Sequence, residues 1–297
     1  MSFKSAKIVL EGLSQENRRI ATIGRAMLAL RAHYPLSQLS RHAKQALAFL
    51  ERNGLIEAIP GTRAFYKVTA PFVGSKELNP YELVMEAYYD GILAYSTALE
   101  LHQLTDQRFR TLHVLVPDRK DEDMRLLGTS LYEWELLLLP TPSRIKEMDE
   151  YTIVSHRMNR EWSFGYEIMK PHGFPLRVID IERTLIDGLR HAKHCGGLDE
   201  VFRAWVRAYD LLDVGKIVSY AEKYDIGVLY QRVGFVLETM GLTHPQFLSW
   251  RENHVQRGGS RVLDPERPFS GGRFDERWAL SINHPVSILE QMDASYS

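Results

Sequence analysis

Residues 36–69, LSQLSRHAKQALAFLERNGLIEAIPGTRAFYKVT, decide the expected fold of the N-terminal region. Their first half repeats apolar side chains at the helical period, and one stripe contains Leu36, Leu39, Ala43, Leu47 and Leu50. Asn53 and Gly54 tolerate a left-handed backbone and are therefore expected to end this helix. The second half holds two β-rich runs around a Pro60-Gly61-Thr62 turn, a pattern that predicts a β-hairpin.

The residues before this stretch extend the pattern toward the N-terminus. Residues 15–53 are expected to be helical, because apolar residues from Ile20 onward follow the helical period. Pro35 interrupts that helix, and Ser37 is the expected N-cap of the next one. Helix, tight turn, second helix and β-hairpin is the element order of a winged helix-turn-helix.

The rest of the chain predicts a larger domain of mixed composition. Strands are expected at 111–116, 136–139, 151–155 and 176–179, and helices at 181–190, 198–209, 214–223 and 228–240. The fold class is therefore predicted to be α+β. We expect a winged helix-turn-helix over residues 1–72, a turn-rich linker over 73–80, and a mixed α/β domain over 81–297.

Charge is divided unevenly along the 297 residues. Residues 1–72 hold 11 Lys or Arg against 4 Asp or Glu, whereas the whole chain has a net charge of -1. A basic N-terminal module on a mildly acidic body favours a polyanionic partner for that module. The single cysteine cannot form an internal disulfide, and no apolar run approaches the length of a membrane span, so we expect a cytoplasmic protein.

The outward face of the helix over residues 37–53 is suited to double-stranded DNA. An α-helix fits the major groove, where Arg reads guanine and Gln reads adenine. The candidate DNA-binding residues of this helix are Ser37, Gln38, Ser40, Arg41, Lys44 and Gln45. Thr62 and Arg63 in the hairpin turn are expected to contact the DNA backbone or minor groove. The alternative is a winged helix that binds only protein and leaves Arg41 and Lys44 solvated.

The stretch 177–197, RVIDIERTLIDGLRHAKHCGG, is the strongest candidate for chemistry in the C-terminal domain. Asp180 is placed to cap a helix that Gly196-Gly197 would end, and Arg183 and Asp187 are spaced to pair on its surface. A metal site from His191, His194 and Cys195 would lack a fourth ligand nearby. A Cys–His catalytic pair would lack a third group to orient it. We therefore expect no metal, cofactor or catalytic residue here.

Two segments of this domain resemble those of a known family. Residues 98–104, ALELHQL, are similar to an A-L-x-x-H-G-L segment, with Gln103 in the place of Gly. Residues 180–187, DIERTLID, are similar to a D-P-x-R-T-x-x-D segment, with Ile181 in the place of Pro. With a winged helix in front, the chain resembles the AbiEi-type antitoxins of abortive-infection (type IV) toxin–antitoxin systems. The residues that carry this resemblance are His102, Asp180, Arg183, Thr184 and Asp187.

The resemblance implies a non-enzymatic protein with two functions. It would repress its own operon, and it would counter a nucleotidyltransferase-like toxin without forming a stable complex with it. Two other interpretations remain open. One is an enzyme that acts on nucleic acid or nucleotides through Asp180, Glu182, His191, His194 and Cys195, and the other is a transcriptional regulator that has no toxin partner.

Overall fold

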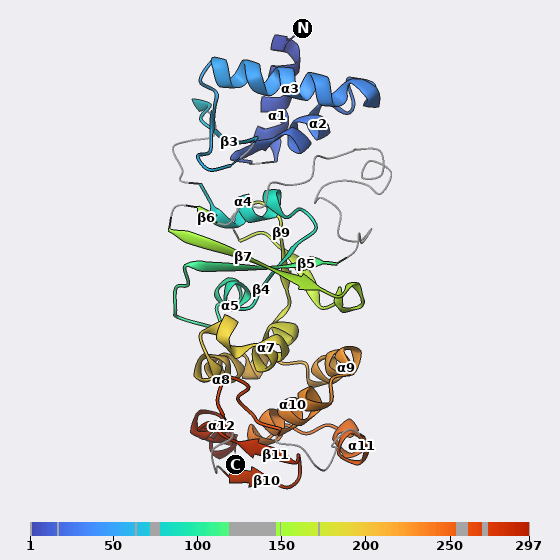
Figure 1. Ribbon diagram of the computed structural model, residues 1–297, viewed down its shortest axis with the longest axis vertical. Coiled ribbons are helices and arrows are strands. Elements are labelled where there is room, and N and C mark those ends of the chain that lie inside the picture. Colours follow the sequence, from blue (N-terminus) through green and yellow to red (C-terminus); the bar gives the residue numbers. More distant parts are fainter. Residues whose placement is uncertain are drawn as a thin grey trace. The chain divides into compact units, whose positions relative to one another are not determined.

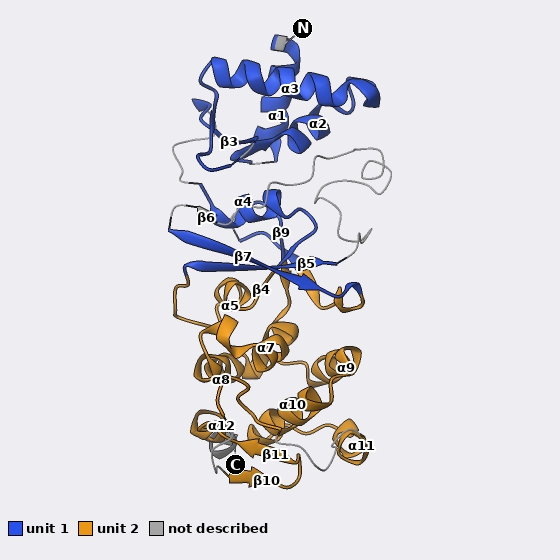
Figure 2. Ribbon diagram, viewed as in Figure 1, with its two compact units in different colours: residues 1–92, 110–160, 168–177 blue, residues 93–109, 161–167, 178–297 orange. Residues whose placement is uncertain are grey.

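The computed structural model describes residues 2–16, 18–62, 64–71, 78–118, 147–148, 150–171, 173–253, 261–268 and 273–296. The chain divides into two compact units, which Figure 2 distinguishes by colour. Unit 1 comprises residues 1–92, 110–160 and 168–177, and unit 2 comprises residues 93–109, 161–167 and 178–297. Helices and three β-sheets are mixed along the chain, which confirms the predicted α+β class.

Unit 1 begins with three helices and three short strands (Figure 1). These are α1 (Ser2–Gln15), β1 (Ile20–Thr22), α2 (Ile23–Leu30), α3 (Leu36–Arg52), β2 (Ile56–Ala58) and β3 (Phe65–Val68). The strands form an antiparallel sheet in the order β1-β3-β2, with Ile20 opposite Lys67 and Ile56 opposite Val68. The three helices pack on one another around aliphatic side chains that are fully buried, Leu39 among them.

This segment confirms the β-hairpin and corrects three details of the sequence prediction. Ser37 is not the N-cap of α3, because Pro35 occupies that position and provides no side-chain hydrogen bond. Leu36 does not belong to the buried stripe, since it is 46 % exposed. Residues 20–22 form a strand rather than helix, because their backbone pairs with β3. The predicted end of α3 is correct, as Gly54 has a φ of 66°.

The remainder of unit 1 contributes a helix and three strands. Helix α4 (Pro80–Ala87) starts at Asn79, whose side chain accepts a hydrogen bond from the Tyr81 backbone N–H. Strands β5 (Thr111–Pro117) and β7 (Tyr151–Met158) run parallel over their whole paired length. The two-residue strand β6 (Glu147–Met148) pairs antiparallel with β7.

A six-stranded sheet connects these strands to three others in the order β6-β7-β5-β4-β9-β8. The added strands are β4 (Ile92–Ala94), β8 (Tyr166–Met169) and β9 (Leu176–Ile179). Strands β4 and β9 are parallel, with Leu93 opposite Val178. The chain passes from one unit to the other within each of these three strands.

Unit 2 is mainly helical, with a small hairpin before its last helix (Figure 1). Its helices are α5 (Ser96–Leu101), α7 (Ile181–Arg190), α8 (Leu198–Arg207), α9 (Val214–Tyr224), α10 (Gly227–Thr239), α11 (Gln246–Asn253) and α12 (Ser287–Tyr296). Strands β10 (Arg273–Asp275) and β11 (Leu280–Ile282) are antiparallel. Trp205, Trp250 and Trp278 are buried in its core.

Several elements of the C-terminal domain were predicted from the sequence, whereas strands β4, β8, β10 and β11 and helices α11 and α12 were not. The strands expected at 111–116, 151–155 and 176–179 and the four expected helices are present. The first of those helices ends at Arg190, as the range 181–190 predicted, but Gly196-Gly197 do not end it, because a separate 3₁₀ turn at Ala192–Cys195 lies between them. The strand expected at 136–139 lies outside the described residues, and the domain limits at 72 and 81 stay a prediction. No described helix is long and apolar enough to cross a bilayer.

Candidate functional site

The polar face predicted for α3 is solvent-exposed. Ser37, Gln38, Ser40, Arg41, Lys44 and Gln45 are all exposed. Within the described part of the chain, no ion pair or hydrogen bond joins the Arg41 or Lys44 side chain to another residue. Both cations are therefore available to an external partner. Arg63 lies outside the described residues, and the half-buried Thr62 donates its hydroxyl to the Ile59 carbonyl at 2.7 Å, a bond that stabilises the turn.

The opposite face of α3 fixes how the helix is presented. Leu39, Ala43 and Leu50 are fully buried against α1 and α2. His42 stacks on the Tyr34 ring with centroids 4.0 Å apart, and the Tyr34 hydroxyl lies 2.8 Å from Ser5 Oγ. This packing holds one face of α3 in the core, so that the polar residues must point outward.

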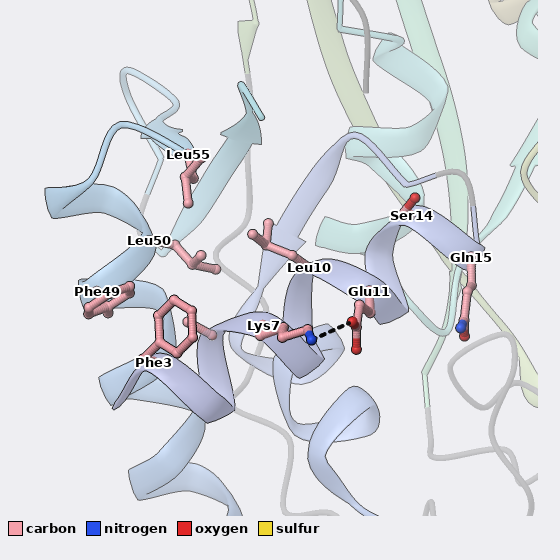
Figure 3. A pocket seen from close by; sticks show the side chains of 10 residues that line it. Phe3, Lys7, Leu10, Glu11, Ser14, Gln15, Phe49, Leu50 and Leu55 are labelled. Atoms are coloured by element: carbon pink, nitrogen blue, oxygen red, sulfur yellow. Dashed lines mark ion pairs between the residues drawn. The ribbon is translucent and has the colours of Figure 1, made fainter. Parts of the chain in front are cut away.

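A separate apolar groove lies between α1 and the C-terminal end of α3. It has a volume of about 460 Å³, and Figure 3 shows Phe3, Leu10 and Phe49 along it. Phe3 is 68 % exposed and meets Phe49 edge to face. On α3, Phe49 follows Gln45 by one turn and Arg41 by two, so this groove borders the C-terminal end of the candidate DNA face.

Two arginines in the basic N-terminal region do not contribute to its surface charge. Arg18 and Arg25 are buried, and both pair with the buried carboxylate of Glu86 on α4 at 3.4 and 2.8 Å. Thr22 Oγ1 also donates to this carboxylate. The positive charge available to a polyanion is therefore smaller than the sequence count indicates. The link also shows that α4 packs against the preceding helices and strands.

A second glutamate of α4 holds the start of β1. Glu82 Oε1 accepts hydrogen bonds from the backbone N–H groups of Arg19 and Ile20 at 3.0 and 3.3 Å. Its Oε2 is buried and has no hydrogen-bond partner among the described residues. Burial raises the pKa of Glu82 to about 7, because a charged carboxylate without solvent is disfavoured. Neither glutamate was identified from the sequence, since their partners lie more than 60 residues away.

In unit 2, Asp180 caps α7 as predicted. Its Oδ1 accepts from the Arg183 backbone N–H at 3.0 Å, and its Oδ2 accepts from the Tyr220 hydroxyl at 2.7 Å. Lys216 lies 3.2 Å from the same oxygen and also pairs with Glu182 at 2.8 Å. These contacts raise the pKa of Lys216 although partial burial opposes the shift. Asp180 therefore joins the start of α7 to α9.

Arg183 and Asp187 form a pair, but not on the surface as predicted. Each side chain is 1 % exposed, and their ion pair measures 3.4 Å. Arg183 also donates to the carbonyls of Trp162 and Phe164, and the Tyr224 hydroxyl donates to Asp187 Oδ1 at 2.5 Å. The contacts named here join α7 to α9, to the 3₁₀ turn Arg160–Trp162 and to the loop at Phe164, and they satisfy the buried charges of the pair.

Thr184 and His102 also form hydrogen bonds at the junction between β9 and α7. Thr184 Oγ1 donates to the Asp180 carbonyl at 2.7 Å, and His102 Nε2 lies 2.7 Å from the Ile179 carbonyl oxygen. The His102 side chain is 3 % exposed. All five residues that carry the family resemblance therefore lie in one structural cluster around the start of α7.

The two departures from the family segments occupy special backbone positions. Gln103 has a φ of 60°, in the left-handed region that favours glycine. Ile181 is the first residue of α7, directly after the N-cap, where proline is favoured because its missing N–H is not needed. The backbone at Gln103 would suit the Gly of the family segment, and the backbone at Ile181 would suit the Pro. The chain therefore has the backbone conformation that the family residues favour at both positions, although its own residues differ.

His191, His194 and Cys195 lie in surroundings that disfavour their charged forms. The Cys195 thiol is fully buried, and burial raises its pKa, which disfavours the thiolate that catalysis or metal binding requires. Burial lowers the pKa of His191 and of His194, whose ring centroids are 6.0 Å apart. Among the described residues of unit 2, these three side chains do not converge on a common point at metal-ligand distance.

The fold and site define a two-unit α+β protein with an exposed basic helix. No protein-family model matches the chain, and no curated protein matches it. Among solved structures, the chain is similar to the RV2827C protein from Mycobacterium tuberculosis, with 12 % identity over 98 % of this chain and 95 % of that one. The TM-score is 0.55. At this identity, the similarity concerns the fold alone.

Proposed function

We propose that this chain is a transcriptional repressor that binds double-stranded DNA through a winged helix-turn-helix formed by residues 2–70. The observation that carries the proposal is the exposed polar face of α3, which presents Arg41 and Lys44 on a helix whose other face is buried. The order α1, β1, α2, α3, β2, β3 and the antiparallel sheet also support it. A helix of this kind fits the major groove.

The proposed contacts follow from the chemistry of each side chain. Arg41 donates two hydrogen bonds to a guanine edge, while Gln38 and Gln45 pair with adenine. Lys44 and the two serines contact phosphates, which fix the register of the helix. The β2–β3 hairpin lies beside the adjacent backbone or minor groove, where Arg63 adds a positive charge.

We further propose that the repressor is an antitoxin of the AbiEi type that acts in the cytoplasm on its own operator. The support is the match of residues 98–104 and 180–187 to the family segments, together with the structural cluster that these residues form around Asp180. The resemblance implies that the C-terminal domain opposes a nucleotidyltransferase-like toxin without catalysing a reaction and without forming a stable complex with it.

A gel shift with the DNA upstream of its own gene tests the DNA-binding proposal. The Arg41→Ala/Lys44→Ala variant should bind at least tenfold more weakly and with a shallower salt dependence, because fewer counterions are released. Since both side chains are exposed, stability should change by no more than about 0.5 kcal/mol per site.

The matched control removes the same charge from another helix. Lys4 and Lys7 are exposed on α1, and the Lys4→Ala/Lys7→Ala variant should keep most of the binding. Equal losses in the two double variants would indicate attraction by overall charge and reject α3 as the recognition helix. Absence of binding by the wild-type protein would reject the repressor proposal.

A further inference from the structure

The groove between α1 and the C-terminal end of α3 has a largely apolar lining that is open to solvent. Its volume is about 460 Å³, and it follows α1 from Phe3 to Gln15 (Figure 3). Leu10, Phe49 and Leu55 lie along it and are each only half-buried. At one end of the groove, 68 % of Phe3 is exposed. An exposed apolar surface of this kind marks a contact with a second molecule.

The charges that line this groove cancel. Among the described residues of the lining, the charged ones are Lys7 and Glu11, which form an i,i+4 ion pair of 3.7 Å. Both side chains are more than half exposed, so each can also meet a charge on another molecule. Although the groove borders the candidate DNA face, a lining without net charge does not favour a polyanion. It favours a partner that presents an apolar side chain beside one positive and one negative group.

A second copy of this chain presents that combination. When two α1 helices lie antiparallel across a two-fold axis level with Val9, position 7 of one helix is opposite position 11 of the other. Lys7 of each copy then faces Glu11 of the other copy, so the same two residues form both charge pairs. Position 3 comes opposite position 15, so Phe3 of each copy reaches the far end of the other copy's groove. A two-fold dimer requires a surface that complements itself in this way.

We propose that this groove is the contact surface of a two-fold homodimer, in which each copy inserts Phe3 into the groove of the other. A cavity of about 150 Å³ with an apolar lining admits a benzene ring, so the groove has room for the Phe3 ring and the stem of a neighbouring side chain. Among the described residues, Phe3 is the most exposed large apolar side chain, and the dimer removes it from water. The dimer forms without DNA and does not depend on the proposed function.

Sedimentation equilibrium of the full-length protein without DNA measures the dimer. Wild-type protein should be dimeric at micromolar concentrations. Phe3→Ala should raise the dissociation constant about a hundredfold, because two phenyl rings per dimer no longer leave water. Phe274→Ala is the matched control, since Phe274 is 54 % exposed on β10 in unit 2 and its removal should leave the constant unchanged. Far-UV circular dichroism checks that both variants keep the wild-type helix content.

Charge reversal tests the antiparallel arrangement. In Lys7→Glu two glutamates would face each other at both contacts, and in Glu11→Lys two lysines would, so each variant alone should dimerise about tenfold more weakly. An equimolar mixture of the two variants should associate as strongly as wild type, because every contact between copies then joins opposite charges. The ion pair within one helix is absent from both variants and from the mixture, so this recovery requires a contact between copies.

The Lys4→Ala/Lys7→Ala variant should remain dimeric, because it removes a weak charge pair without bringing like charges together. Three results would each reject the dimer: wild-type protein that is monomeric at micromolar concentrations, Phe3→Ala that associates as wild type does, or a mixture of the two charge variants that associates no better than either alone. None of these results bears on DNA binding, which the gel shift tests separately.

Discussion

At the residue scale, Gln103 occupies the left-handed position that closes helix α5. The Gln103 N–H bonds the Glu100 carbonyl at 3.1 Å, and the Leu104 N–H bonds the Leu99 carbonyl at 2.9 Å. This pair of hydrogen bonds is the Schellman motif, which requires a positive φ at its central residue. A residue that has a Cβ is destabilised in this conformation, because the Cβ comes too close to the following carbonyl oxygen.

Replacing Gln103 by Gly should therefore stabilise the protein. We expect a gain of about 0.5–1 kcal/mol, which is the relief of left-handed strain less the greater freedom of glycine in the unfolded chain. Urea unfolding followed by tryptophan fluorescence measures it, since Trp205, Trp250 and Trp278 are buried in unit 2. Gln103→Ala is the control, because alanine keeps the Cβ and should not stabilise. A loss of stability in the Gly variant would mean that contacts of the glutamine side chain outweigh the strain.

The cluster around Asp180 shows which features of a site the sequence can predict. Capping by Asp180 follows from local rules, as does the spacing of Arg183 and Asp187 on one helix. Burial of that pair was not predicted, because its shielding comes from Trp162 and Tyr224, which are distant in sequence. The helical period identifies which residues are neighbours on one helix, but it does not identify the residues from other parts of the chain that bury them.

At the element scale, the contact of α4 with β1 depends on a protonated carboxyl group. The pKa of Glu82 is raised from its ordinary value of 4.5 to about 7 by burial, so the folded protein retains a proton that the unfolded chain releases. The stabilising contribution is thus complete below about pH 4.5, and it is lost as the pH rises through about 7. The loss amounts to at most about 3 kcal/mol between these limits.

The Glu82→Gln variant tests this pH dependence. Gln is neutral at every pH and keeps an oxygen acceptor for Arg19 and Ile20. Thermal unfolding followed by circular dichroism should show a smaller decrease in midpoint between pH 5 and pH 8 than in the wild type. Glu57→Gln, at an exposed site on β2, should retain the wild-type decrease. Equal pH dependence in the wild type and Glu82→Gln would contradict the assignment of the proton to Glu82.

Strand β1 shows why short elements were missed. Its three residues continue an apolar pattern that also fits a helix, and only pairing with β3 makes them a strand. The longer elements, such as α3 and α10, were predicted because many repeats of one period support them. The hairpin β2–β3 was predicted because its turn residues are local.

At the scale of the whole molecule, the two proposed activities should be separable. The Arg41 and Lys44 side chains are exposed and form no hydrogen bond or ion pair with another described residue, so their removal should not alter unit 2. In cells that express a neighbouring nucleotidyltransferase-like toxin from an unrelated promoter, the Arg41→Ala/Lys44→Ala variant should protect growth as well as wild type. On a reporter under the protein's own promoter, the same variant should lose repression, whereas Lys4→Ala/Lys7→Ala should keep both activities.

Loss of protection at equal protein levels would mean that toxin neutralisation requires the DNA-binding face. If the wild-type protein does not protect growth, the antitoxin proposal is rejected and the repressor proposal stands. The two can be separated because this protein does not repress the unrelated promoter from which the toxin is expressed.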